Sequence, residues 1–371
     1  MSTLFSAHHL GSLALANRLV VSPMCQYVGE DGKATAWHVA HLGSLAASGA
    51  GAVFIEATAV EPVGRITPGD LGLWDDITEA ALGRAVEAMR VVSPQTRVIL
   101  QLSHAGRKAS SAEPWLGGQQ LPLDARGWVT VAPSALPQIE GEQAPQALTL
   151  DGLARVREAF VAAALRAVRL GVDGIELHGA HGYLLHEFLS PISNRRDDAY
   201  GGTLENRMRF PLEVFSAMRA SVPEQVPLGI KVSATDWVEG GWDLAQTIEF
   251  AQALKLRGLT WITVSSGGIS PKQAIPVAPG YQIPLAQAIK DATGLSTIGV
   301  GLITEPQQAE DIIAAGRVDV VALARAMLYN PRWGWHAAAA LGASIDAPPS
   351  YWRAVPAQHA QLFRNSRHGA R

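Results

Sequence analysis

The segment His178-Gly179-Ala180-His181-Gly182-Tyr183 places two imidazoles and a phenol close together in the chain. Two neutral imidazoles can donate hydrogen bonds to one carbonyl oxygen and stabilise the negative charge that develops on it, and a phenol can then supply a proton. Zinc binding is an alternative, although no third ligand is evident nearby and the spacing lacks the glutamate of the helical metalloprotease motif. A turn whose histidines only satisfy backbone groups is the other alternative.

Cys25 is the only cysteine, which excludes an intrachain disulfide and any multi-cysteine metal site and favours a reducing compartment. It follows Ser22-Pro23-Met24 at the end of an apolar run. Most free cysteines are small buried hydrophobic residues, whereas the place of this one at a strand end also allows a functional role.

Short apolar runs rich in β-branched residues alternate with longer stretches of helical spacing. Strands are expected at 18–21, 52–56, 97–102, 174–177, 228–232, 261–265, 296–300 and 318–322. Helices are expected at 37–48, 75–92, 204–222, 243–256, 284–292 and 331–341. Two more helices are expected to begin at an N-cap at Asp151 and at a capping box at 304–307. This alternation predicts a single-domain (β/α)8 TIM barrel over 1–371, with a doubly wound sheet as the competing architecture.

Two segments depart from the repeat. The Pro- and Gly-rich stretch 103–147 is a long insertion after the third strand, and such loops are usually covers or binding loops. The C-terminal tail 343–371 has no obvious place in a closed barrel.

Alternation within the strands predicts which side chains enter the barrel. In the run 174–177, Glu176 alternates with aliphatic residues and His178 follows on its face, and Lys231 alternates in the same way within 228–232. With the aliphatic faces packed on helices, these three polar side chains are expected to project into the lumen or its mouth.

Gly301 and Arg325 follow the seventh and eighth predicted strands, where this fold often binds phosphate. Backbone N–H groups at a Gly-containing turn and an arginine fork suit a dianion. The pair therefore favours a phosphate-bearing ligand.

The composition limits the class of partner. The chain has 371 residues, of which 48% are hydrophobic and 17% charged, and a formal net charge of −3. Disorder is therefore not expected, and no basic excess is available for nucleic acid. Because no stretch resembles a membrane span or a secretory signal, we expect a soluble, cytoplasmic protein.

Several ordered motifs resemble those of the old yellow enzyme family. They are Ser22-Pro23-Met24-Cys25-Gln26-Tyr27, Ile55-Glu56-Ala57-Thr58-Ala59-Val60, Gln101-Leu102-Ser103-His104-Ala105-Gly106-Arg107-Lys108, Glu176-Leu177-His178-Gly179-Ala180-His181-Gly182-Tyr183-Leu184, Phe188-Leu189-Ser190-Pro191-Ile192-Ser193-Asn194-Arg195-Arg196, Tyr200-Gly201-Gly202 and Glu205-Asn206-Arg207. The cysteine after Pro-Met and the C-terminal Tyr351-Trp352-Arg353 resemble the thermophilic-like class, close to xenobiotic reductase.

The resemblance implies an FMN-dependent ene-reductase. NADPH or NADH would pass a hydride to flavin N5, and an α,β-unsaturated carbonyl compound would then bind over the same face in a ping-pong cycle. His178 and His181 would hold the carbonyl oxygen, N5 would deliver hydride to Cβ, and Tyr183 would protonate Cα.

The resemblance also implies roles for the other site residues, and it implies no metal site. Ser22, Pro23, Met24 and Cys25 would line the non-covalent flavin, Ala57 and Gln101 its polar edge, Lys231 its pyrimidine side, and Gly301, Ala324 and Arg325 its phosphate. Cys25 would also tune the flavin potential, and Tyr27 would contact substrate. In this class the tail crosses a dimer interface, so Trp352 or Arg353 would enter the neighbouring subunit's site; whether dimers pair into tetramers stays open.

Lys231 stands where the family usually has arginine, so the charge is kept and the planar fork is lost. A different hypothesis is a cofactor-free barrel lyase that uses Lys231 as a Schiff base on a phosphorylated carbonyl substrate, which requires burial to lower its pKa. A barrel that binds a ligand without turning it over is the third hypothesis.

Overall fold

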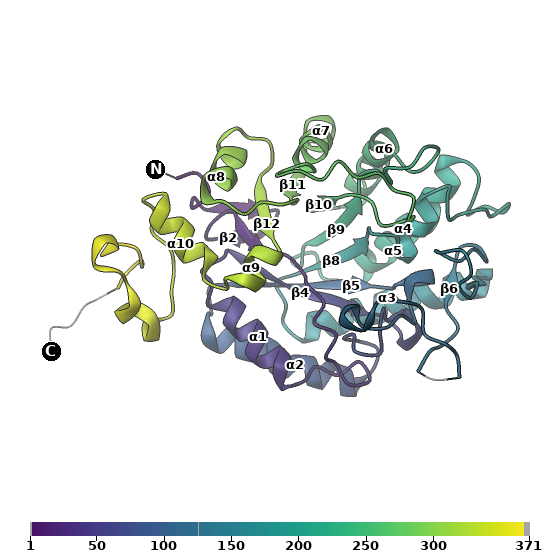
Figure 1. Cartoon of the computed structure of the whole chain (residues 1–371), viewed down its shortest axis with the longest axis horizontal. Helices are drawn as coiled ribbons and strands as arrows, with labels where there is room; N and C mark the ends of the chain where they lie inside the picture. Colours follow the sequence, from purple (N-terminus) through teal and green to yellow (C-terminus); the bar gives the residue numbers. More distant parts are fainter. Residues whose placement is uncertain (1, 125, 367–371) are drawn as a thin grey trace.

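The computed structural model of the chain describes residues 2–124 and 126–366. Parallel strands close into an eight-stranded barrel, in which each strand pairs with the next along the chain and the last pairs with the first (Figure 1). The strands are β3 (Leu19–Val21), β4 (Ala52–Ala59), β5 (Arg97–Ser103), β8 (Gly174–Gly179), β9 (Leu228–Ser233), β10 (Trp261–Ser265), β11 (Ser296–Gly299) and β12 (Val320–Leu323). The predicted TIM barrel is confirmed, and the doubly wound alternative is wrong.

A helix follows each barrel strand and packs outside it. In chain order these helices are α1 (Ala36–Ala46), α2 (Asp76–Val92), α3 (Leu150–Arg169), α5 (Leu204–Ser221), α6 (Leu244–Lys255), α7 (Ile283–Thr293), α8 (Pro306–Ala314) and α10 (Trp333–Ala340). Two short helices, α4 (Leu184–Leu189) and α9 (Arg325–Tyr329), lie after β8 and β12. The sequence analysis did not predict α4, because its residues are all buried and show no amphipathic period.

The N-termini of two helices differ from the sequence expectation. The N-cap of α3 is Thr149 rather than Asp151, and its hydroxyl oxygen accepts a hydrogen bond from Gly152 N at 3.1 Å. The expected capping box at 304–307 is wrong, because no side chain caps α8 at Glu305. Instead the Gln308 side chain, one position further along, accepts from Thr304 N at 3.1 Å.

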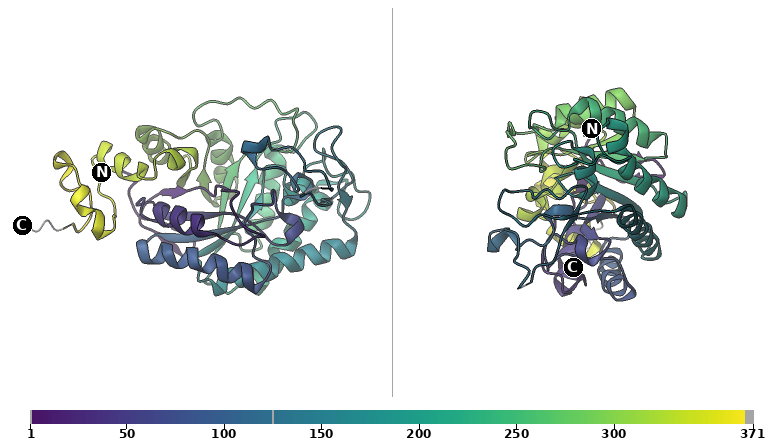
Figure 2. Two further views of the ribbon diagram at one scale, coloured as in Figure 1. Left: turned by 60° about the horizontal axis from the view of Figure 1, so that its bottom comes forward. Right: turned by 90° about the vertical axis from the view of Figure 1, so that its right-hand side faces the viewer.

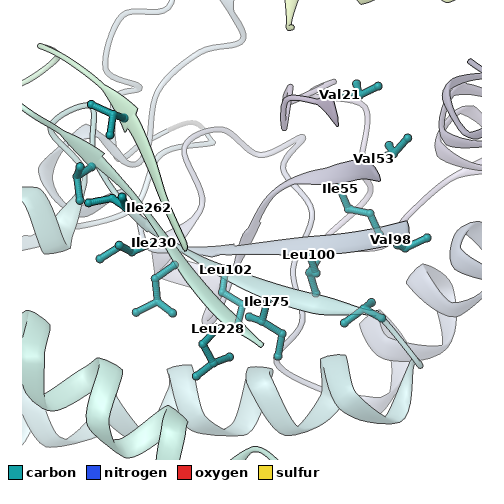
Figure 3. Close-up of a cluster of buried hydrophobic side chains, with 14 of the residues drawn as sticks. Val21, Val53, Ile55, Val98, Leu100, Leu102, Ile175, Leu228, Ile230 and Ile262 are labelled. Carbon is teal, nitrogen blue, oxygen red and sulfur yellow. The ribbon is translucent and has the colours of Figure 1, made fainter. Parts of the chain in front are cut away.

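The core has two layers, one outside the barrel and one inside it. Figure 3 shows aliphatic side chains of the outer layer, such as Leu100, Ile175 and Leu228, between the strands and the helices. The inner layer includes Phe54 and Trp261, whose rings meet edge to face at 6.4 Å. This alternation is what sends Glu176 and Lys231 inward.

An N-terminal hairpin, which the sequence analysis did not predict, joins the inner layer. Strands β1 (His8–Leu10) and β2 (Leu13–Leu15) pair antiparallel, and their buried leucines belong to the same cluster as Trp261. The turn of this hairpin packs closely against Thr260, the residue before β10, because a Cβ on Gly11 would lie 2.3 Å from the Thr260 side chain. The hairpin therefore packs at the N-terminal end of the barrel, and the opposite end is left for the site. Strands this short show no readable period.

The expected insertion between β5 and α3 contains short regular segments. It contains the 3-10 turns η2 (Gly106–Lys108) and η3 (Pro114–Leu116) and the two-residue strands β6 (Val131–Ala132) and β7 (Gln146–Ala147). Trp128 Nε1 donates to Val63 O at 3.0 Å, which ties the insertion to η1 (Pro62–Gly64) in the loop after β4.

The tail lies beside the barrel, at the left of Figure 1 and of the left-hand view in Figure 2. It contains η4 (Pro349–Ala354) and η5 (Ala357–His359) and returns to pair Ile345 with Phe363. Phe363 is buried against Trp335 of α10, with ring centres 5.0 Å apart. Residues 367–371 of the expected arm lie outside the described residues. No helix in the described part of the chain is both long and apolar enough to span a membrane.

Candidate active site

A cavity of about 200 Å³ opens at the carboxyl ends of the strands. It is lined by Ser22 and Pro23 after β3, Lys231 of β9, Ser265 at the end of β10, and the loops after β11 and β12. The sequence-predicted residues Gly301 and Ala324 lie in these two loops, and Arg325 begins α9 directly after the second; all three line the same cavity.

One end of the cavity is built from backbone. Gly301 has a φ of +118°, and a Cβ at this position would lie 2.9 Å from the Gln282 side-chain nitrogen. Only glycine suits such a position. Arg325 is exposed at the start of α9, so its guanidinium is available to an anion that enters this end.

Lys231 supplies the buried charge of the cavity. It is only 7% exposed, and in the strand register it lies beside His178 of β8 and Thr263 of β10. Burial lowers the pKa of Lys231, while the negative charge of Glu176 raises it. Within the described residues no acceptor lies within hydrogen-bond distance of its ammonium group.

The two imidazoles and the phenol of 178–183 are adjacent in the structure. The ring centre of His178 lies 5.1 Å from that of His181 and 4.7 Å from that of Tyr183. The turn depends on a left-handed residue, His181 with φ +60°, whose N–H donates to Ser233 Oγ at 2.9 Å. Gly182 N donates to His186 Nδ1 at 2.9 Å, which fixes the other side of the turn.

Both imidazoles are held neutral. Burial is the main cause that lowers the pKa of His178 and of His181 well below the usual value, and the positive charges of Lys231 and Lys108 act in the same direction. His178 Nδ1 accepts from Ala180 N at 3.3 Å, so in the neutral ring Nε2 carries the hydrogen and can donate.

His181 is engaged differently from His178. Its Nε2 lies 2.8 Å from Ser265 Oγ, and this hydroxyl donates in turn to Gln282 Oε1 at 3.1 Å. With the serine hydrogen directed at Gln282, the His181 hydrogen is directed at serine. Ser265 and Gln282 therefore orient the His181 imidazole and give its N–H an acceptor in the absence of substrate.

Burial raises the pKa of the Tyr183 phenol well above its usual value, so the group is a proton donor at neutral pH. Lys108, from η2, lies with Nζ 5.3 Å from the centre of the Tyr183 ring and donates to His181 O at 2.9 Å. Burial lowers the pKa of Lys108 to about 8.

Cys25 and Tyr27 lie in the segment that follows β3, and Tyr27 contacts the insertion. Burial raises the pKa of the Cys25 thiol, and Asp70 and Glu56 add to the effect. Tyr27 meets Trp115 of η3 edge to face at 6.1 Å. The thiol is thus protonated and not a ready nucleophile.

Two further predicted cofactor residues lie nearby. Met24 is half-buried and packs against the main core. Gln101 is buried in the lumen, where its Nε2 donates to Glu176 Oε1 at 2.8 Å.

Trp352 and Arg353 are not brought to the site of their own chain. They belong to η4 of the tail, where Trp352 Nε1 donates to Ala347 O at 3.1 Å. Arg332, before α10, stacks between Trp335 and Tyr351 at 4.9 and 5.1 Å and holds η4 in place. Arg353 is exposed.

Sequence reasoning missed Lys108, Ser265 and Gln282. Lys108 stands in one of the resembling motifs, next to Arg107, and a basic pair directly after a strand is a signal that could have been used. Ser265 is the last residue of β10 and could have been found by the same strand-end rule as His178. Among the described residues no group of three or more potential ligands is arranged to hold a metal ion.

Comparison with known proteins supports one family throughout. The model of the NADH:flavin oxidoreductase / NADH oxidase family matches residues 3–342. The chain is 42% identical over 353 residues to NADPH dehydrogenase of Halalkalibacterium halodurans, which covers 95% of this chain and 98% of the relative. It is 44% identical over 356 residues to NADPH dehydrogenase of Listeria innocua, covering 95% and 99%.

Among solved structures, morphinone reductase in complex with tetrahydroNAD aligns with a TM-score of 0.74 at 28% identity, over 97% of this chain and 94% of that one. 2-Naphthoyl-CoA reductase aligns with a TM-score of 0.82 at 24% identity, over 94% and 54%, and shows a shared fold. The chain belongs to the NADH:flavin oxidoreductase / NADH oxidase family, the old yellow enzyme family that its motifs resemble, and is an NAD(P)H-dependent flavin oxidoreductase with FMN as its cofactor.

Proposed function

We propose that the protein is an ene-reductase that reduces the C=C bond of α,β-unsaturated carbonyl compounds. The observation that carries this proposal is the group of two neutral imidazoles and a protonated phenol, with ring centres 4.7 and 5.1 Å apart, beside Lys231 at the barrel mouth. Such a group binds a carbonyl oxygen and supplies a proton.

The residues present fit FMN. The backbone loop at Gly301, which a Cβ would obstruct, together with the Arg325 side chain suits the phosphate. Lys231, buried in the wall of the same cavity, suits the electron-rich pyrimidine side of the ring, and Gln101 lies in the lumen as a partner for its polar edge. Ser22, Pro23, Met24, Cys25, Ala57 and Ala324 would complete the lining.

When bound, FMN accepts a hydride from NADPH or NADH and supplies one to the β-carbon of the second substrate. His178 Nε2–H would donate to the carbonyl oxygen, and His181 Nε2–H would do so in place of its hydrogen bond to Ser265 Oγ. Because both rings stay neutral, they stabilise developing negative charge without giving up a proton.

Tyr183 would deliver the proton to the α-carbon. Its pKa is far above neutral, so the phenol is protonated across the working range, and Lys108 near its ring stabilises the negative charge that the departing proton leaves. Tyr27 and Cys25 would line the substrate side. Since the nicotinamide and the carbonyl compound would share this space, ping-pong kinetics are expected.

We also propose that the chain forms a homodimer in which the tail completes the neighbouring subunit's site. The support is that Trp352 and Arg353 lie in a tail that stands beside its own barrel (Figure 2). The lyase hypothesis is set aside, because it requires a cofactor-free barrel and this family uses FMN.

The test is the pair of half-reactions in Tyr183→Phe. Anaerobic stopped-flow should show flavin reduction by NADPH at close to the wild-type rate, and reoxidation by cyclohexenone slowed about 10²- to 10⁴-fold, the usual contribution of general acid catalysis. Reoxidation at the wild-type rate would contradict the role of Tyr183. Failure of the wild-type protein to reduce any enone would overturn the proposed function.

A further inference from the structure

Glu176 is a fully buried carboxyl group in the lumen that the proposed chemistry does not use. Gln101 Nε2 donates to its Oε1 at 2.8 Å, and Trp261 Nε1 and Thr263 Oγ1 donate to its Oε2 at 3.2 and 2.5 Å. The indole can only donate, and the three donors together favour the ionised carboxylate. Burial raises the pKa of Glu176, and Lys231 and these donors oppose the rise.

Lys231 is the positive charge that this carboxylate faces. Thr263, whose hydroxyl donates to Glu176, is the strand neighbour of Lys231, and Glu176 lies two positions before His178, the other neighbour. Charges in a buried lumen interact more strongly than charges in water. The positive potential that Lys231 presents to the cavity is therefore reduced by Glu176.

The Gln101 amide is oriented by the same carboxylate. Because its nitrogen donates to Glu176, its oxygen is left to accept a hydrogen bond, and a flavin ring offers an N–H group at its pyrimidine edge. Glu176 thus acts on two residues that the proposed FMN placement puts against one edge of the ring.

We propose that Glu176 is a positioning residue that lowers the reduction potential of the bound flavin, by offsetting the charge of Lys231 and by holding the Gln101 amide. Reduction adds negative charge to the ring, and a positive group nearby favours it. A carboxylate behind that group opposes it. This inference rests on the proposed flavin placement over Lys231, but not on the enone as substrate.

The experiment measures the flavin potential of FMN-loaded variants against a reference dye at pH 7. Glu176→Gln keeps the shape and removes the charge, and should shift the flavin–dye equilibrium toward reduced flavin by at least tenfold, which is about 30 mV for a two-electron couple. Glu176→Asp keeps the charge and should stay close to wild type. Lys231→Gln should shift the equilibrium in the opposite direction.

Glu187→Gln is the matched control. Glu187 is also fully buried, but it lies in α4 outside the barrel strands, and burial raises its pKa to about 8, so it is largely uncharged at pH 7. Its replacement should leave the potential unchanged. A Glu176→Gln potential equal to wild type, or a shift as large in Glu176→Asp as in Glu176→Gln, would overturn the inference.

If Glu176→Gln does not fold, a double variant replaces it. Removing the charges of both Glu176 and Lys231 leaves neither charge buried without its partner. The double variant Glu176→Gln/Lys231→Gln should then have a more positive potential than Lys231→Gln, and equal potentials would sink the idea. An unchanged potential in Lys231→Gln would show that the flavin does not lie over Lys231. The dye titration contains no enone, so absent enone turnover would overturn the proposed substrate class alone.

Discussion

The ammonium group of Lys108 lies 5.3 Å from the centre of the Tyr183 ring and donates to the carbonyl oxygens of His181 and Gly268 at 2.9 and 3.2 Å. It thereby joins the proposed proton donor, the turn 178–183 and the loop after β10. Gly268 has no room for a side chain, because a Cβ would lie 2.5 Å from the His181 backbone. The turn 178–183 is thus held from two sides.

This contact predicts the pH dependence of the proton-donating step. Burial lowers the pKa of Lys108 to about 8, so the ammonium charge is present below that pH and is lost above it. Enone-dependent reoxidation should therefore slow as the pH rises through about 8. In Lys108→Met the fall should disappear and the rate at pH 7 should drop about tenfold, the effect of losing roughly 1.4 kcal/mol of charge stabilisation. Lys255→Met, which removes a lysine on α6, is the control. A pH profile unchanged in Lys108→Met would contradict this role.

The two histidines predict a separation between the half-reactions. In the double variant His178→Ala/His181→Ala, flavin reduction by NADPH should be affected less than enone turnover, which should fall by at least 10²-fold, the cost of losing an oxyanion donor. Single variants divide the roles: His178 has a free Nε2–H, whereas His181 shares its Nε2 with Ser265. We expect the larger loss from His178→Ala. Steady-state kinetics with cyclohexenone provide the measurement, and unaltered turnover in the double variant would refute both assignments.

Much of the barrel and part of the site follow from alternation in the sequence. Glu176 and Lys231 were placed in the lumen because strand side chains alternate and their neighbours are aliphatic. Lys108 and Gln282 could not be placed in this way, since both reach the site from irregular connections whose course depends on the folded barrel. The hairpin β1–β2 was missed for a related reason, because its strands are too short to show a period.

Glu187 predicts a pH dependence of stability. Its Oε1 accepts from Arg107 N at 2.8 Å, and burial raises its pKa from 4.5 to about 8. The folded chain therefore keeps a proton on Glu187 that the unfolded chain loses, so the contribution of this group to stability is greatest below about pH 4.5 and declines as the pH rises toward 8. Because Asp70, with a pKa of about 7, acts in the same direction, the readout is the difference from Glu187→Gln.

Urea titrations at pH 5, 7 and 9 measure that difference in the free energy of unfolding. Glu187→Gln cannot titrate, so its stability relative to wild type should increase with pH and level off above about 8. A difference that does not change with pH would show that Glu187 is ionised in the folded protein.

The tail predicts complementation between subunits. If Arg353 enters the neighbouring site, Arg353→Ala and Tyr183→Phe homodimers are both impaired, but a mixed dimer has one site with an intact Tyr183 and an intact Arg353 from the other subunit. Co-expression of the two variants with different affinity tags isolates the mixed dimer, which should recover up to half of the wild-type enone turnover. Gln358→Ala, which changes an exposed residue of η5 in the same tail, is the control variant. Light scattering measures whether a variant has lost the dimer. Recovery no greater than the mean of the two parent homodimers would place Arg353 outside the neighbouring site, because two defects confined to their own subunits cannot restore each other.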